Sequence, residues 1–237
     1  MLLLVAGLIA GLTALAHTAP FPFLIDVAGP AESIWRMPPR PTPTVYLTYD
    51  DGPNAAVTPA LLDVLKREGT VATFFLIDKH VTGETAPLVR RQFAEGHAVA
   101  LHTDTRAWAF MTPSRVEQAL RAAASRIERA GGQPPCRAFR PHAGWRSRDM
   151  MQGLSEAGYV LVGWTWRMWD FNWYRTPHPE ALAWRLAARA SPGAIIVMHD
   201  GHHKNPRADR RHVVEATALL IPELRRRGFA FERVCGS

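Results

Sequence analysis

Apolar and polar positions along most of the chain alternate between two kinds of segment. Short runs rich in β-branched and aromatic residues predict strands, and each precedes a segment of helical spacing that begins near Ser, Thr or Pro and ends near Gly. The expected strands are 45–49, 71–77, 98–102, 136–140, 159–164, 194–198 and 229–234. The expected helices are 58–69, 88–95, 112–131, 147–158, 179–190 and 212–227, the last kinked at Pro222. About seven β/α repeats predict an α/β fold of parallel strands wrapped by helices.

The first 43 residues follow a different pattern. Met1 to Ala16 form an apolar run closed by Ala-Leu-Ala, which resembles a secretory cleavage site, although no Lys or Arg precedes the run. Residues 1–25 are therefore expected to be a signal peptide, an uncleaved membrane anchor or, third, a buried core helix. Residues 26–43 are rich in proline and predict an extended lead-in. We expect a folded domain at 44–234 and an exported protein, either secreted or membrane-anchored.

Polar side chains stand where the predicted strands end. In a parallel β/α barrel the carboxyl ends of the strands form one rim, where loops build the active site from residues far apart in sequence. The pattern therefore predicts a catalytic constellation drawn from several strands. The strand-end residues are Asp50, Asp51, His102, Arg140, Trp164 and His199.

Adjacent carboxylates at Asp50 and Asp51 cannot easily share one role. Two ionised carboxylates confined together raise each other's pKa unless a cation holds one of them charged. A metal on one and proton transfer by the other resolves this conflict. The alternative is an Asp-Gly-Pro turn in which the aspartates only cap backbone amides. His199 follows an apolar strand and is suited to general-acid catalysis, the alternative being a structural core histidine.

Five motifs occur in the order seen in the polysaccharide deacetylase family. They are TYDDGP at 48–53, HTDTR at 102–106, FRPHAG at 139–144, a Trp-rich segment around Asp170, and MHD at 198–200. Over 44–234 the chain resembles this family, the carbohydrate esterase family 4 built on the NodB homology domain. The resemblance implies a distorted β/α barrel of about seven parallel strands. It also implies metal-assisted removal of acetyl groups from N-acetylated sugars in polysaccharides such as peptidoglycan or chitin-like chains.

Matching the motifs residue by residue implies a division of labour. Asp50 corresponds to the general base and His199 to the general acid, whereas Asp51 and His102 correspond to metal ligands. The implied metal is a divalent cation, with zinc favoured. It would polarise the amide carbonyl and the attacking water, while backbone N–H groups help to stabilise the oxyanion.

Two further residues take supporting roles in the same comparison. Arg140 corresponds to the arginine that holds the base carboxylate. Asp170 corresponds to the group that tunes the imidazole of His199, in the least regular of the five motifs. His199 would then protonate the departing sugar nitrogen.

Arg106 departs from the family pattern, which has a metal-ligating histidine at this position. An arginine stays protonated and has no lone pair to donate. Three alternatives remain open: His142, His202 or His203 replaces the ligand, Arg106 turns outward and leaves a two-ligand site, or Arg106 takes over part of the metal's charge. A catalytically impaired glycan-binding domain is the alternative to an altered but active hydrolase.

Aromatic residues concentrate between Trp164 and Tyr174 and are suited to stacking against sugar rings. Trp169 and Trp173 are expected to contact substrate, together with His142 at the third motif. Trp164 and Trp166 are expected to be buried, because they alternate at the end of a strand.

Composition narrows the remaining possibilities. The 237 residues are 47% hydrophobic, which excludes disordered and fibrous classes. The formal charge of +7 comes almost wholly from arginine and is interpreted as a solvated basic face; the basic segment 202–211 is also suited to contact with an anionic wall polymer. Recognition modules for nucleic acid are not apparent, so no nucleic-acid partner is expected. Cys136 and Cys235 permit one disulfide if the protein is exported, and the sequence leaves their pairing open.

Overall fold

The computed structural model describes residues 5–7, 33–166, 170 and 176–235. Its strands all pair in parallel. They are β1 (Ser33–Ile34), β2 (Thr44–Gly52), β3 (Thr73–Ile77), β4 (Ala98–His102), β5 (Ala138–Arg140), β6 (Val160–Val162), β7 (Ile195–His199) and β8 (Ala230–Phe231). The sheet order is β1-β6-β5-β4-β3-β2-β7, and β8 pairs with the beginning of β2.

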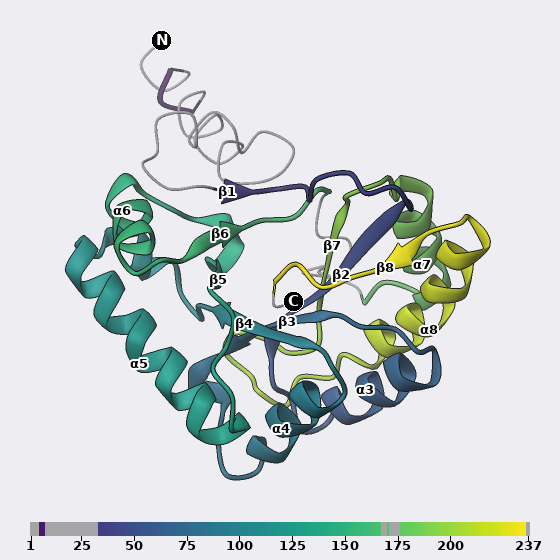
Figure 1. Ribbon diagram of the computed structural model, residues 1–237, viewed down its shortest axis with the longest axis horizontal. Helices are drawn as coiled ribbons and strands as arrows, with labels where there is room; N and C mark the ends of the chain where they lie inside the picture. The colour runs from purple at the N-terminus through teal and green to yellow at the C-terminus, as the bar shows by residue number, and fades with distance from the viewer. Residues whose placement is uncertain (1–4, 8–32, 167–169, 171–175, 236–237) are drawn as a thin grey trace.

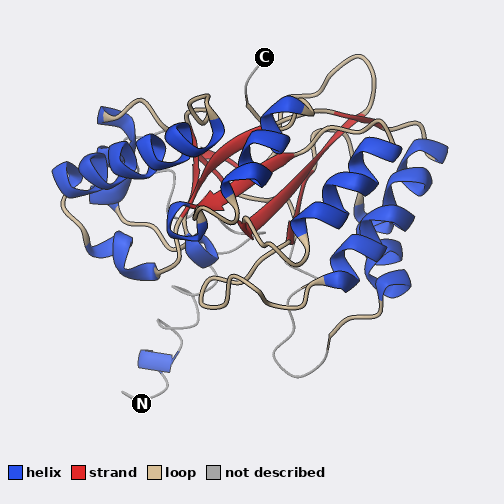
Figure 2. Ribbon diagram, turned by 90° about the horizontal axis from the view of Figure 1, so that it is seen from below, coloured by secondary structure: helices blue, strands red, loops and turns tan. Residues whose placement is uncertain are grey.

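Helices surround the curled sheet on its outside (Figures 1 and 2). They are α3 (Thr58–Arg67), α4 (Ala86–Ala94), α5 (Pro113–Gly131), α6 (Arg148–Glu156), α7 (Pro179–Arg189) and α8 (Arg211–Arg226). Short 3-10 turns occur at η1 (Asp78–His80), η2 (Arg106–Phe110) and η3 (His142–Gly144). The predicted α/β fold, a distorted barrel of about seven parallel strands, is therefore confirmed.

The sequence signals at the two ends of α6 act as expected. The Ser147 hydroxyl accepts a hydrogen bond from the Met150 amide at 3.1 Å and caps α6. Gly158 follows the same helix with φ of 70°, a left-handed conformation that side chains with a Cβ rarely adopt. Pro222 lies inside α8, as predicted.

Residues 33–37 take part in closing the barrel, although they belong to the proline-rich segment expected to precede the domain. The Gly163 amide donates to the Ile34 carbonyl at 2.8 Å, and the Met37 amide donates to the Gly193 carbonyl at 2.9 Å. This stretch thus bridges the end of β6 and the loop before β7. It lies in the gap where the sheet would otherwise present two open edges.

Each of the six strands β2 to β7 contributes alternate side chains to two separate apolar clusters, because successive residues point to opposite faces. The larger cluster, which includes Leu47 and Phe74, fills the space between the sheet and the helices. The smaller cluster lies inside the barrel and takes one residue from each of six strands. Its strand members are Tyr46, Phe75, Ala100, Ala138, Val162 and Ile195.

Cys136 and Cys235 form a disulfide with their Cα atoms 6.1 Å apart. The bond joins the end of the chain to the segment just before β5, across 99 positions of sequence. Among the described residues, none of the helices has the length and apolar character needed to cross a membrane. The predicted signal peptide or anchor at 1–25 lies outside the described residues, apart from 5–7.

Candidate active site

The polar residues predicted to converge occupy the last inward positions of their strands. On β2, Tyr46 points into the barrel interior, so Asp50 four residues later points to the same side. The same alternation directs His102, Arg140 and His199 inward. Register then aligns them, because Asp50 pairs with His199 between β2 and β7, and His102 pairs with Arg140 between β4 and β5. The structure therefore brings the four residues to one rim.

Arg140 is fully buried and holds Asp50. Its Nη1 lies 2.6 Å from Asp50 Oδ1 and 2.9 Å from Thr48 Oγ1. Its Nε and Nη2 donate to the carbonyls of Val162 and Gly163 at 3.0 and 2.8 Å. Burial lowers the pKa of Arg140, while the Asp50 charge and hydrogen bond raise it. The guanidinium stays charged because an arginine pKa begins far above neutrality.

At Asp51 the regular alternation of side chains between the two faces of β2 is interrupted. The register of β2 against β3 shifts between Asp50 and Gly52, and Asp51 has φ of 69°. Such a bulge re-aims a side chain without ending the strand. Asp51 Oδ1 consequently lies 3.4 Å from His102 Nε2. The bulge gives the two adjacent aspartates different partners.

His102 presents one ring nitrogen to Asp51 because its other nitrogen is occupied. Its Nδ1 lies 2.8 Å from the Arg140 carbonyl oxygen, which can only accept, so Nδ1 carries the proton. Nε2 is therefore the ring nitrogen that faces Asp51. A ligating histidine is typically oriented in this way by a hydrogen bond to a backbone carbonyl.

His142 completes a cluster with Asp51 and His102. One candidate ligand atom from each residue lies within 4.8 Å of the other two. Asp51 Oδ1 is buried and has no hydrogen-bond partner among the described residues. Two imidazoles and a carboxylate form the donor set of many catalytic zinc sites. The orphaned oxygen and the donor chemistry both fit a divalent cation.

The pKa shifts of Asp51 and His142 favour the protonation states that can bind a metal ion. Burial opposes the charge on Asp51, but the neighbouring histidines, His102 first, outweigh it and hold the Asp51 pKa well below its usual range. Burial, followed by the charge of His102, lowers the pKa of His142 to about 4. At neutral pH the cluster thus offers a carboxylate and a neutral imidazole from His142.

Arg106 points away from this cluster. Its side chain is exposed at the beginning of η2, and its guanidinium carbon lies 5.2 Å from the centre of the Trp145 ring. It therefore stacks on an aromatic face instead of facing the ligand atoms. Among the three alternatives left by the sequence, the outward orientation and a replacement ligand at His142 occur together.

His202 and His203 extend the row of rings beyond His142. The His142 and His203 ring centres are 4.4 Å apart, as are those of His203 and His202. His203 Nδ1 is buried without a hydrogen-bond partner among the described residues. Neither residue belongs to the three-residue cluster with Asp51 and His102.

His199 is held by Asp170 on the other side of the rim. The Asp170 carboxylate lies 3.0 Å from His199 Nδ1 and also accepts from the His199 amide at 2.7 Å. Burial disfavours the imidazolium, but the charge and hydrogen bond of Asp170 outweigh it and raise the His199 pKa to about 9. His199 is thus a cation at neutral pH, with Nδ1 held by Asp170.

Arg210 is a functional residue that sequence analysis missed. Its Nη2 donates to Asp170 at 2.9 Å, and its Nε donates to the His199 carbonyl at 3.0 Å. It stands in the basic segment interpreted as surface, yet its side chain is buried. Arg207 and Arg211, in the same segment, are exposed, and nothing in the local sequence distinguishes Arg210 from them.

Two more buried groups support the Asp50-Asp51 turn and were also missed. His80 Nδ1 lies 3.0 Å from the Asp51 carbonyl oxygen. The Asp200 carboxyl accepts from the Thr58 hydroxyl at 2.5 Å, and burial raises the Asp200 pKa to about 7. Asp200 stood next to the proposed acid in a recognised motif, whereas His80 belonged to no motif.

The aromatic segment gives a mixed outcome. Trp164 is buried as predicted, at 2% exposure, and packs edge-on against Trp35. Trp166 is 37% exposed, so the prediction that it is buried is wrong. The strand alternation on which that prediction rested ends at Val162, where β6 stops. Trp169 and Trp173 lie outside the described residues.

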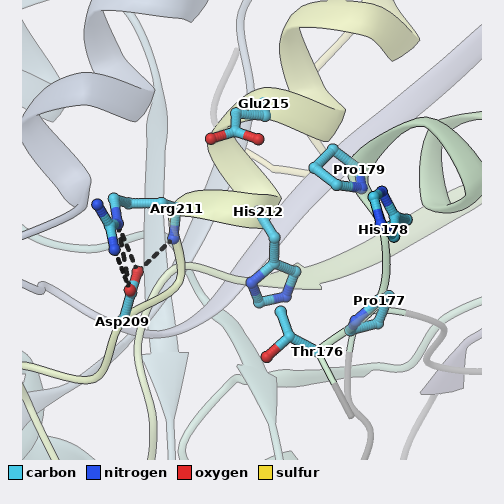
Figure 3. Close-up of a pocket in the computed structure, with 8 residues that line it drawn as sticks. All are labelled: Thr176, Pro177, His178, Pro179, Asp209, Arg211, His212 and Glu215. Carbon is cyan, nitrogen blue, oxygen red and sulfur yellow. Dashed lines mark hydrogen bonds and ion pairs between the residues drawn. The ribbon is translucent and has the colours of Figure 1, made fainter.

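A separate surface hollow of about 480 Å³ lies between the beginnings of α7 and α8 (Figure 3). Its wall includes His212, whose Nε2 lies 3.3 Å from the Asp170 carbonyl oxygen, and the ion pair of Asp209 with Arg211. The predicted acid, base and metal ligands do not line it. The remaining lining residues are Thr176, Pro177, His178, Pro179 and Glu215.

The fold and rim define a class of hydrolase, with a carboxylate and an imidazolium beside a cluster suited to a divalent cation. A family model described as polysaccharide deacetylase matches residues 38–162. The chain belongs to the polysaccharide deacetylase family, whose members are hydrolases acting on non-peptide carbon–nitrogen bonds. Its activity class is the removal of N-acetyl groups from polysaccharide.

Curated relatives and a solved structure agree with this assignment. The chain is 36% identical to a chitooligosaccharide deacetylase from Bradyrhizobium sp. (strain ANU 289), covering 79% of this chain and 87% of the relative. It is 30% identical to a peptidoglycan-N-acetylglucosamine deacetylase from Bacillus cereus, covering 80% and 85%. A family 4 acetyl xylan esterase from Clostridium thermocellum, solved with a cobalt ion, is 27% identical with a TM-score of 0.69, covering 81% and 88%.

Proposed function

We propose that this protein removes acetyl groups from N-acetylglucosamine residues of a cell-wall or chitin-like polysaccharide. The observation that carries the proposal is the pairing of Asp50 with His199 on adjacent strands, beside a cluster of three ligand groups. A base and an acid are thereby placed at one rim. The named activities of the chitooligosaccharide and peptidoglycan relatives support the choice of substrate.

Asp51, His102 and His142 would hold the divalent cation. Zinc is the metal best suited to one carboxylate and two imidazoles, and the cobalt ion in the related esterase supports a divalent site. When bound, the cation supplies positive charge to polarise the amide carbonyl and to acidify water. Asp51 is ready for this role because its buried Oδ1 lacks another partner among the described residues.

Asp50 acts as the general base. Arg140 and Thr48 fix its environment from the inside of the barrel: Arg140 Nη1 donates to both Asp50 Oδ1 and Thr48 Oγ1, and the carboxylate would accept a proton from water. The fully buried guanidinium cannot reorient without leaving the carbonyls of Val162 and Gly163. The carboxylate is therefore held in place before substrate arrives.

His199 acts as the general acid. Asp170 holds the imidazolium by Nδ1, and the imidazolium gives a proton to the sugar nitrogen as the carbon–nitrogen bond breaks. Proton removal at Asp50 and proton delivery at His199 occur on neighbouring strands, so a single bound amide can meet both. Acetate and a free amino sugar are the products.

We also propose that the protein works outside the cytoplasm. The apolar run from Met1 to Ala16 is typical of an export signal, and the bond between Cys136 and Cys235 is typical of an oxidising compartment. Membrane attachment through residues 1–25 finds no support in the described residues.

Acetate release from N-acetylglucosamine oligomers and from peptidoglycan tests the activity. We expect zinc-dependent release by the native protein and its loss in the variant Asp50→Ala, with folding checked by circular dichroism. A protein that binds these glycans but releases no acetate, with zinc, cobalt or other divalent metals, would be the impaired glycan-binding domain instead.

A further inference from the structure

Arg106 is a cation without a counter-charge at the edge of the active site. Its exposed guanidinium stacks on Trp145, and among the described residues no carboxylate pairs with it. Arg207, also exposed on a rim loop, instead pairs with Glu84 at 2.5 and 2.7 Å. An unpaired arginine held by an aromatic ring is thus a distinctive feature of this rim.

The position of Arg106 is tied to the candidate metal ligands. It follows His102 by four residues, and the amide of its partner Trp145 donates to the His142 carbonyl at 3.2 Å. A group bound by Arg106 would therefore belong to the reacting sugar or to its immediate neighbour in the chain.

The Arg106 guanidinium is exposed beside Trp145. Its carbon lies 5.2 Å from the ring centre, and its N–H donors lie in the plane of the group. Two parallel N–H bonds from one edge of the group match the two oxygens of a carboxylate. The Trp145 ring restricts the side chain before ligand binds, which reduces the conformational entropy lost on binding.

A second cation lies along the same row of histidines. Lys204 is exposed and has no carboxylate partner among the described residues. Positive charge therefore flanks the row at both Arg106 and Lys204. The field at this rim favours an anionic ligand over a neutral one.

We propose that Arg106 is a specificity-determining residue that binds a carboxylate of the glycan. The substrate is then an N-acetylated polysaccharide with a carboxylate on the reacting sugar or on the next one. This inference rests on the proposed deacetylase function and names the substrate class of the same site. It gives position 106 a role in recognition in place of metal binding.

A matched pair of substrates tests the assignment. One is a tetrasaccharide of alternating N-acetylglucosamine and N-acetylmuramic acid, and the other carries the same lactyl carboxyls as methyl amides. We expect kcat/KM of the native protein to be at least about 10-fold higher for the acid, the scale of a hydrogen bond to a charged group. In Arg106→Gln we expect this ratio to fall to about 1.

Arg121→Gln is the matched control, because Arg121 is exposed on α5 and pairs with Glu117. It should keep the native ratio of acid to amide. A native ratio near one, or a native preference that survives in Arg106→Gln, would overturn the assignment.

A binding measurement tests the carboxylate site separately from deacetylase activity. In an Asp50→Asn background, calorimetry should show tighter binding of the acid than of the amide, with the difference lost in Arg106→Gln and weakened by salt. If neither tetrasaccharide releases acetate but this difference is present, the proposed function fails and the carboxylate site stands. If both are deacetylated and bound equally, the function stands and the carboxylate site fails.

Discussion

The two halves of the rim are built in opposite ways. In the proton-transfer half, the charged groups are already paired: Asp50 with Arg140, and His199 with Asp170. These pairs are buried and take further bonds from neighbouring side chains and backbone. This half is organised by the protein's own charges.

In the metal half, Asp51, His102 and His142 direct ligand atoms toward one point. Asp51 Oδ1 has no hydrogen-bond partner among the described residues, and His142 has its pKa lowered to about 4, which keeps it neutral. A buried polar atom without a partner is destabilising unless a ligand satisfies it. In the proposed function a divalent cation would complete this half, so metal removal should affect it while leaving the other half in place.

The largest expected effect comes from breaking the proton-transfer half. Asp50→Asn should lower kcat by about 10²–10⁴-fold, because an amide cannot accept the proton from water. Zinc stoichiometry, measured by inductively coupled plasma mass spectrometry, should stay at the native value. Loss of zinc together with activity would show that the two halves are not independent.

Breaking the metal half should instead weaken zinc binding. His142→Ala removes one ligand and should raise the zinc Kd at least about 100-fold, measured by competition with a chromogenic chelator. His203→Ala, which removes the adjacent ring outside the cluster, is the control and should leave the Kd within about threefold. Equal effects of the two substitutions would argue against His142 as the ligand.

The pH dependence tests the acid directly. Because the His199 pKa is raised to about 9, its imidazolium persists through neutral pH, and kcat should fall as pH rises through about 9. Its ion pair stabilises the fold fully below about pH 6.5 and loses this contribution as pH rises through the folded pKa.

Asp170→Asn removes the main group that raises this pKa. The basic limb of the kcat profile should move down by about one pH unit, lowering kcat about twofold at pH 8 and about tenfold at pH 10. Histidine NMR titration of the same variant should show the lower pKa. An unmoved limb would mean that another group supplies the proton.

The smallest expected effect is the change in zinc affinity when Arg106 is replaced by histidine. Arg106→His restores the family's usual residue, but His142 already completes the cluster, so the zinc Kd should change by less than about threefold. A large gain in zinc affinity would show that the native site lacks its third ligand.

The sequence by itself determined the frame of the molecule and most of the residues at its rim. Alternating apolar positions and local signals such as Ser147 and Gly158 define the strands and helices through contacts only a few residues apart. The polar residues at strand ends then follow from the parallel β/α order, because that order places all such ends on one side. Asp50 and His199 could be paired in this way before any contact was known.

Only the tertiary structure decided which of several equivalent groups enters the site. His142, His202 and His203 are chemically identical, and their distances to Asp51 depend on how two loops from different strands pack. Arg210 turns inward for the same kind of reason, although its arginine neighbours are exposed. Closure of the barrel by residues 33–37 and pairing of Cys136 with Cys235 also join distant segments. Such long-range choices depend on packing and side-chain rotamers across the whole fold, and local sequence patterns do not encode them.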